Sequence, residues 1–124
     1  MTGHGKVLVV DDDRWLAELL AGELQTAGYQ VQTAEHTLDA IAAIDEFRPD
    51  AITLDVFMPG PNGIVLLHEL QSHADLAQIP VVLCTNSASE LPTTSLRAYG
   101  VKTVLDKTTM QPGDVTAAVK RCMA

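Results

Sequence analysis

The chain has 124 residues, of which 47% are hydrophobic, and its formal net charge is −8 at neutral pH. This length predicts one globular domain over residues 1–124, with an ordered core of about 5–123. No apolar stretch is long enough to span a bilayer. The acidic balance argues against direct binding to nucleic acid, which depends on Lys and Arg. The two cysteines do not make a disulfide framework, so we expect a cytoplasmic protein without a membrane partner.

Short apolar runs alternate with segments of helical periodicity along the whole chain. The runs are expected to be strands, at residues 6–10, 29–33, 51–54, 80–84 and 101–105. The segments between them are expected to be helices: a first one from Leu16 to a stop at Gly28, a second from an N-cap at Thr37 to Pro49, a third with an N-cap at Asn62 and inner residues to Leu70, a fourth from Pro92 to Gly100, and a last one over residues 112–122.

The strands read as continuous apolar runs, which is typical of a parallel sheet covered on both faces. Right-handed crossovers between such strands leave few topologies. The sequence therefore predicts an α/β fold with a doubly wound, five-stranded parallel sheet and helices on both faces. We take the flavodoxin-like strand order 2-1-3-4-5 from the general class of such sheets.

Three consecutive acids, Asp11, Asp12 and Asp13, follow directly on the first apolar run. Like charges this close destabilise one another unless a cation offsets them. Oxygen ligands of this kind suit Mg²⁺. A helix N-cap explains one of the three, and we expect Asp13 to be that cap. The remaining pair predicts a metal site.

Other polar residues stand where later strands are expected to end. Asp55 follows the third strand, Thr85 the fourth and Lys107 the fifth. Binding sites of open α/β sheets form beyond the carboxyl ends of the strands, where the strand order reverses. A pocket with carboxylates, a metal and a lysine suits a phosphoryl group, and a carboxylate can act as its nucleophile.

Taken together and in this order, four features make the chain similar to a receiver domain of a bacterial two-component response regulator. They are residues 7–13, residues 54–63, residues 80–85 and Lys107. The resemblance covers essentially the whole chain. It implies phosphoryl transfer to Asp55 from a sensor histidine kinase or a histidine phosphotransfer protein. Apart from its own phosphorylation and dephosphorylation, such a domain catalyses nothing.

The resemblance also implies the roles of the neighbouring groups. Asp12 would bind Mg²⁺ directly and Asp11 through water or by hydrogen bonding, with further oxygens from Asp55 and the main-chain carbonyl of Phe57. Thr85 and Lys107 would each contact a phosphoryl oxygen. The added charge would change the surface around the fourth and fifth strands, which a downstream effector protein or output domain reads. A weak homodimer is left open.

Three residues depart from the family pattern. Val104 stands where the family usually carries an aromatic switch residue, and Asn86 replaces a small residue after the threonine. Thr108 replaces a proline that normally follows the lysine in a cis bond. A cis bond before another residue costs about 3 kcal/mol, so we expect a trans peptide after Lys107. These departures leave open a phosphorylation-independent interaction module.

Two classes of enzyme have similar segments. The opening Val10-Asp11-Asp12-Asp13 also fits haloacid-dehalogenase-type phosphohydrolases. That family needs a later acidic pair for its metal, and Asp106 alone is a poor substitute. A strand ending in Asp also occurs in P-loop ATPases, but the chain lacks the required Gly-x-x-x-x-Gly-Lys-Ser/Thr.

Overall fold

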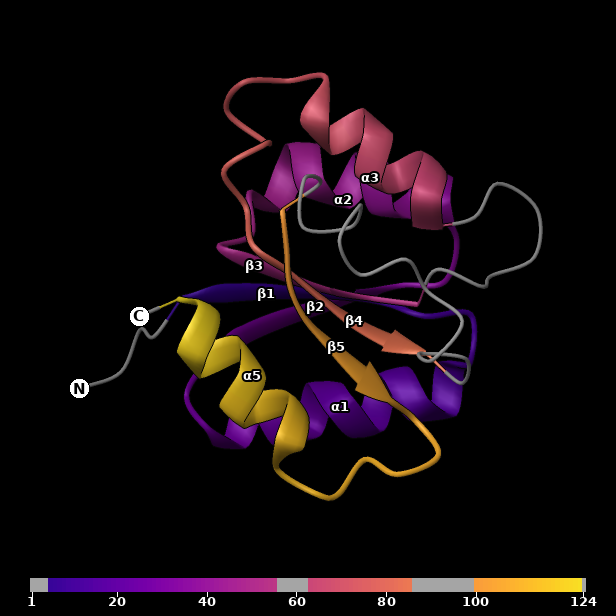
Figure 1. Ribbon diagram of the computed structural model, residues 1–124, viewed down its shortest axis with the longest axis vertical. Coiled ribbons are helices and arrows are strands. Elements are labelled where there is room, and N and C mark those ends of the chain that lie inside the picture. Colours follow the sequence, from indigo (N-terminus) through magenta and orange to yellow (C-terminus); the bar gives the residue numbers. More distant parts are fainter. Residues whose placement is uncertain (1–4, 56–62, 86–99, 124) are drawn as a thin grey trace.

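The computed structural model describes residues 5–55, 63–85 and 100–123. In this part of the chain the strands form one five-stranded sheet in the order β2-β1-β3-β4-β5, and every neighbouring pair is parallel (Figure 1). The predicted fold and strand order are therefore confirmed. The strands are β1 (Lys6–Val10), β2 (Gln30–Ala34), β3 (Ala51–Leu54), β4 (Val81–Thr85) and β5 (Val101–Asp106).

Helices cover both faces of this sheet. The described helices are α1 (Arg14–Thr26), α2 (Thr37–Phe47), α3 (Gly63–Gln71) and α5 (Asp114–Cys122). Helices α1 and α5 lie against one face, and α2 and α3 lie against the other (Figure 1). None of the described helices has the length and apolar character needed to span a membrane. The N-cap predicted at Asn62 and the helix predicted from Pro92 fall outside the described residues.

Several element boundaries differ from the prediction by one or two residues, and two of these differences have a clear local reason. The N-cap of α2 is His36 and not Thr37, because the first helical hydrogen bond runs from the Ala40 amide to the His36 carbonyl (2.9 Å). Thr37 is instead buried in the first turn. Helix α5 begins at Asp114 and not at residue 112, because Gly113 adopts a left-handed conformation with φ of 91°.

The alternation of side chains along the strands divides the core in two. Leu8 and Val10 of β1 pack with α2 and α3 on one face, whereas Val7 and Val9 pack with α1 and α5 on the other. All four side chains are essentially inaccessible to solvent. Burial on both faces explains why the strand sequence is continuously apolar rather than alternating.

The hydroxyl of Thr53 is an exception within this core. Thr53 lies in the central strand β3 and is 1% exposed. Among the described residues, its Oγ1 is the buried side-chain atom that has no hydrogen-bond partner. A buried polar atom without a partner costs about 1–3 kcal/mol.

We therefore expect Thr53→Val, which keeps the side-chain shape, to raise the free energy of unfolding by about 1 kcal/mol. Urea denaturation monitored by circular dichroism measures this change. Thr33→Val is the matched control because Thr33 is exposed on β2, and its effect should be near zero. A fall in stability for Thr53→Val would show that the hydroxyl is satisfied in solution.

Candidate functional site

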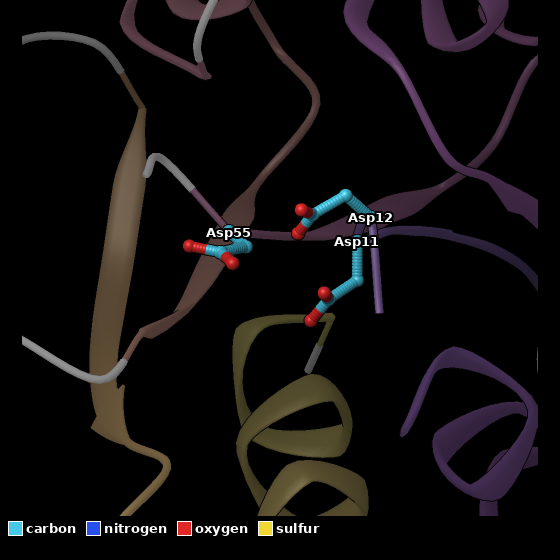
Figure 2. Close-up of side chains that lie close together, drawn as sticks. All are labelled: Asp11, Asp12 and Asp55. Atoms are coloured by element: carbon cyan, nitrogen blue, oxygen red, sulfur yellow. The ribbon is translucent and has the colours of Figure 1, made fainter. Parts of the chain in front are cut away.

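Three carboxylates meet at the carboxyl edge of the sheet. Strands β1 and β3 end in register, with Val10 beside Leu54, and the Asp55 amide donates to the Val10 carbonyl at 3.0 Å. The residues that follow each strand are therefore neighbours. Carboxylate oxygens of Asp11, Asp12 and Asp55 lie within 4.8 Å of one another (Figure 2).

The three acids differ in burial. Asp11 is 1% exposed and Asp55 is 7% exposed, whereas Asp12 is open to solvent. Burial raises the pKa of the Asp11 carboxyl, although hydrogen bonds from Lys107 and from the Asp13 amide oppose this shift. The amide of Asp13 donates to Asp11 Oδ1 at 2.9 Å. Asp11 is thus a constrained carboxylate, and Asp12 is the accessible one.

Lys107 is the cation of the site. Its Nζ lies 2.6 Å from Asp11 Oδ2 and 3.1 Å from Asp55 Oδ2, and its side chain is 9% exposed. Burial alone would lower the pKa of Lys107, but the hydrogen bonds and charges of Asp11 and Asp55 outweigh it, so the pKa is raised above 10.5. The ammonium therefore stays charged at neutral pH and bridges two of the three acids.

The pairing of β4 with β5 positions this lysine. The register shifts between Val81 and Val82, and beyond the shift Thr85 lies opposite Asp106. The amide of Lys107 then donates to the Thr85 carbonyl at 2.9 Å. Thr85 is fully buried, so Thr85 and Lys107 stand side by side where the two strands end.

Two neighbouring residues have structural roles. Asp13 is the N-cap of α1, as predicted, and its Oδ1 accepts a hydrogen bond from the Leu16 amide at 3.2 Å. Cys84 is 2% exposed, and burial raises the pKa of its thiol to about 12. The Cys84 thiol is therefore protonated and inert at neutral pH.

The donor set fits a magnesium ion. Mg²⁺ binds oxygen ligands at about 2.0–2.1 Å, so its ligand oxygens lie at most about 4.2 Å apart. The three carboxylate oxygens lie within 4.8 Å of one another, which is close to this spacing. Both oxygens of Asp11 already accept hydrogen bonds, which suits an indirect role for this residue. Phe57, whose carbonyl the sequence predicts as a further ligand, lies outside the described residues.

The departures from the family pattern are visible on β5 and in the loop after it. Val104 is partly buried against the core on the α2 and α3 face. The described residues contain no cis peptide bond, so the bond after Lys107 is trans as predicted. Asn86 is not among the described residues.

Sequence reasoning missed the contact between Asp106 and Thr108. The Thr108 amide donates to Asp106 Oδ1 at 2.8 Å. An Asp followed two residues later by Thr is typical of a turn closed by the Asp side chain, and this spacing could have revealed it.

Comparison with known proteins agrees with this fold. Residues 7–120 match the family described as the response regulator receiver domain, and the chain belongs to this family. Response regulator MprA of Mycobacterium avium (strain 104) is 40% identical over 85 residues, which cover 68% of this chain and 37% of that protein. The phosphate regulon transcriptional regulatory protein PhoB of Pseudomonas aeruginosa is 37% identical over 84 residues, with the same coverage.

Solved structures show the same architecture. Chemotaxis protein CheY4 of Vibrio cholerae has a TM-score of 0.85 and 28% identity, and the match covers 94% of this chain and 97% of that one. NtrX of Brucella abortus has a TM-score of 0.84 and 26% identity, with 96% of this chain but only 27% of that chain covered. The match with the curated relatives likewise spans little more than a third of their length.

The chain is thus a receiver domain of the two-component type, and membership of this family supports a part in phosphorelay signalling. Receiver domains are generally regulators rather than enzymes. They generally bind Mg²⁺ at an acidic pocket, and this chain has a cluster of three aspartates. Nothing in these comparisons favours a phosphohydrolase or a phosphorylation-independent module.

The raised pKa of Asp11 has a consequence for stability. Between the unfolded value near 3.8 and the higher folded value, the folded state binds more protons than the unfolded state. The unfolding free energy therefore falls as pH rises through this interval. Asp11→Asn cannot ionise, so its stability relative to the native chain should increase from pH 3 to pH 7 in metal-free buffer.

Chemical denaturation at several pH values measures this difference. Glu46→Gln removes an exposed acid of α2 and serves as the control. If the unfolding free energy of the native chain instead increases relative to that of Asp11→Asn as pH rises, burial is not the dominant influence on the ionisation of Asp11.

Proposed function

We propose that Asp55 accepts a phosphoryl group from a phosphohistidine of a sensor histidine kinase or a histidine phosphotransfer protein. The bond between phosphorus and the imidazole nitrogen breaks, its electron pair returns to that nitrogen, and an oxygen of Asp55 forms the new bond to phosphorus. The observation that carries this proposal is the Asp55 carboxylate, 3.1 Å from the Lys107 ammonium and beside two further acids.

Each group around Asp55 has a role in this reaction. Asp12 would hold Mg²⁺ directly, and Asp55 and the Phe57 carbonyl would complete its protein ligands, with Asp11 acting through water or a hydrogen bond. The bound ion would supply positive charge that offsets the phosphoryl oxygens. Lys107 would move from its shared position between two carboxylates towards a phosphoryl oxygen, and the Thr85 hydroxyl would donate to another.

Phosphorylation of Asp55 is proposed to change the structure at the ends of β4 and β5. Thr85 and Lys107 end these strands and are joined through their main chains at 2.9 Å, so a change at Asp55 acts on both. Val104 has no ring that could turn inward. The switch of this domain would therefore depend on Thr85 and Lys107, and a downstream effector protein or an output domain would read it.

The side of the site along α1 offers a contact surface for the phosphoryl donor. Trp15 is 73% exposed and Leu19 is 48% exposed, and both follow Asp13 on this helix. Exposed apolar side chains on one helix next to a reactive group are typical of a protein contact. The chain is proposed to form a single domain over residues 1–124. A cytoplasmic location is also proposed, because both cysteines are free, as is usual for proteins in a reducing compartment.

The acceptor is tested by treating the chain with acetyl phosphate and Mg²⁺. We expect mass spectrometry to find one added phosphoryl group on the native chain, mapped to Asp55, and none on Asp55→Asn. Asp39→Asn, which changes an exposed acid of α2, should be labelled like the native chain.

The other outcomes identify the alternatives. Labelling that survives Asp55→Asn would assign the acceptor to another residue. A native chain that is never labelled would favour the phosphorylation-independent module. Sustained release of phosphate from an ester substrate would favour a phosphohydrolase.

The metal is tested by thermal unfolding with and without Mg²⁺. An ion at one hundred times its dissociation constant stabilises the folded state by about 2.7 kcal/mol, which for this size corresponds to a rise of roughly 10 °C in the melting temperature. We expect Asp12→Asn to lose most of this response.

Asp13→Asn is the matched control, because Asn also caps helices well and Asp13 is a cap rather than a proposed ligand. Its Mg²⁺ response should match that of the native chain. Equal loss in both variants would contradict the assignment of Asp12 as the direct ligand.

A further inference from the structure

The chain reverses direction immediately after Lys107 in a compact turn built on Asp106. Asp106 Oδ1 accepts hydrogen bonds from the Thr108 amide at 2.8 Å and from the Thr108 hydroxyl at 2.5 Å. The Asp106 carbonyl accepts from the amides of Thr109 at 3.2 Å and Met110 at 2.9 Å. Asp106 thus binds each of the three residues that follow Lys107.

The carboxylate form of Asp106 suits this turn. The hydrogen bond from the Thr108 hydroxyl, together with that from the Thr108 amide, holds the pKa of Asp106 below its usual value. Asp106 is therefore ionised at neutral pH, and both oxygens can act as acceptors. Such local side-chain bonds to the backbone are the usual way in which Asp closes a turn.

This turn constrains Lys107 from its carboxyl side. On the other side, the Lys107 amide donates to the Thr85 carbonyl at 2.9 Å. The peptide bonds before and after Lys107 are therefore both held by hydrogen bonds, which restricts its two backbone dihedrals. These dihedrals set the direction in which the side chain leaves the backbone, and its ammonium ends 2.6 Å from Asp11 and 3.1 Å from Asp55.

We propose that Asp106 is a positioning residue for Lys107. Its carboxylate stabilises a trans turn through Thr108, and this turn presents the lysine ammonium to Asp55. The inference rests on the proposed function for its effect on phosphorylation, and on the geometry alone for its effect on Lys107.

The test compares Asp106→Ala with Asp106→Asn, each in the native chain and in a Lys107→Ala background. We expect Asp106→Ala to slow phosphorylation by acetyl phosphate about tenfold, because small misplacements of a catalytic group have effects of this order or larger. Asp106→Asn keeps an acceptor oxygen and should remain within about twofold of the native rate. In the Lys107→Ala background, Asp106→Ala should cause no further loss.

Asp114→Ala is the matched control. Asp114 Oδ2 accepts from the Gln111 amide at 2.8 Å, so its removal breaks a similar bond further along the same loop. The phosphorylation rate of Asp114→Ala should equal that of the native chain. Thr108→Val removes the hydroxyl donor alone and should give an intermediate rate, which keeps the test valid if Asp106→Ala folds poorly.

A second readout does not depend on phosphorylation. Nuclear magnetic resonance of the Lys107 ammonium protons, which exchange slowly when they are held between carboxylates, should show a resolved signal in the native chain and Asp106→Asn. The signal should be lost in Asp106→Ala and kept in Asp114→Ala.

The outcomes separate this inference from the proposed function. Equal losses with and without Lys107, failure of Asp106→Asn to restore the rate, or an unchanged ammonium signal in Asp106→Ala would each overturn the positioning role. If the native chain itself is never phosphorylated, the proposed function fails, and the ammonium signal still decides the role of Asp106.

Discussion

The balance of charge between Lys107 and two buried acids is the constraint on which this edge of the sheet depends. Asp11 and Asp55 are almost inaccessible to solvent, and a buried carboxylate without a partner is strongly unfavourable. One ammonium shared at 2.6 and 3.1 Å offsets part of the negative charge of three carboxylates. The remaining negative charge favours a further cation, and this residual imbalance makes the fold receptive to a metal and then to an anionic group.

The sheet supplies the positions that this balance requires. Asp11 and Asp55 are adjacent because β1 and β3 end in register. Lys107 follows directly on β5, and β4 lies between β5 and β3, the strand that Asp55 follows. Neighbouring strands are roughly 4.8 Å apart, so only a long side chain leaving the backbone in the right direction can bridge that distance. The register shift at Val81 and Val82 and the turn after Lys107 provide that direction.

The strand ends, the acids that follow them and the cap of the first helix could be predicted from the sequence because they follow from local patterns. Buried parallel strands are continuously apolar, so their ends were placed within one residue, and the acids after them fell at one edge. The cap at Asp13 followed from its position before a helix. The contact between Lys107 and Asp11, the shifted register of β5 and the lone hydroxyl of Thr53 had no such pattern. They depend on how side chains meet across strands, which periodicity does not encode. The cap at His36 was missed for a different, local reason, because it accepts through its main-chain carbonyl and not through a capping side chain.

The buried thiol of Cys84 can serve as a natural probe of local opening of the core. Its thiol is buried between the sheet and helices α1 and α5, one residue before Thr85, and it stays protonated at neutral pH. Alkylating reagents react with exposed thiolates, so modification of Cys84 requires the core between the sheet and helices α1 and α5 to open. Cys122 is only half-buried, so we expect it to react sooner and to provide a reference within the same chain. The rate of Cys84 alkylation therefore reports how often this half of the core opens next to Thr85, without any engineered label.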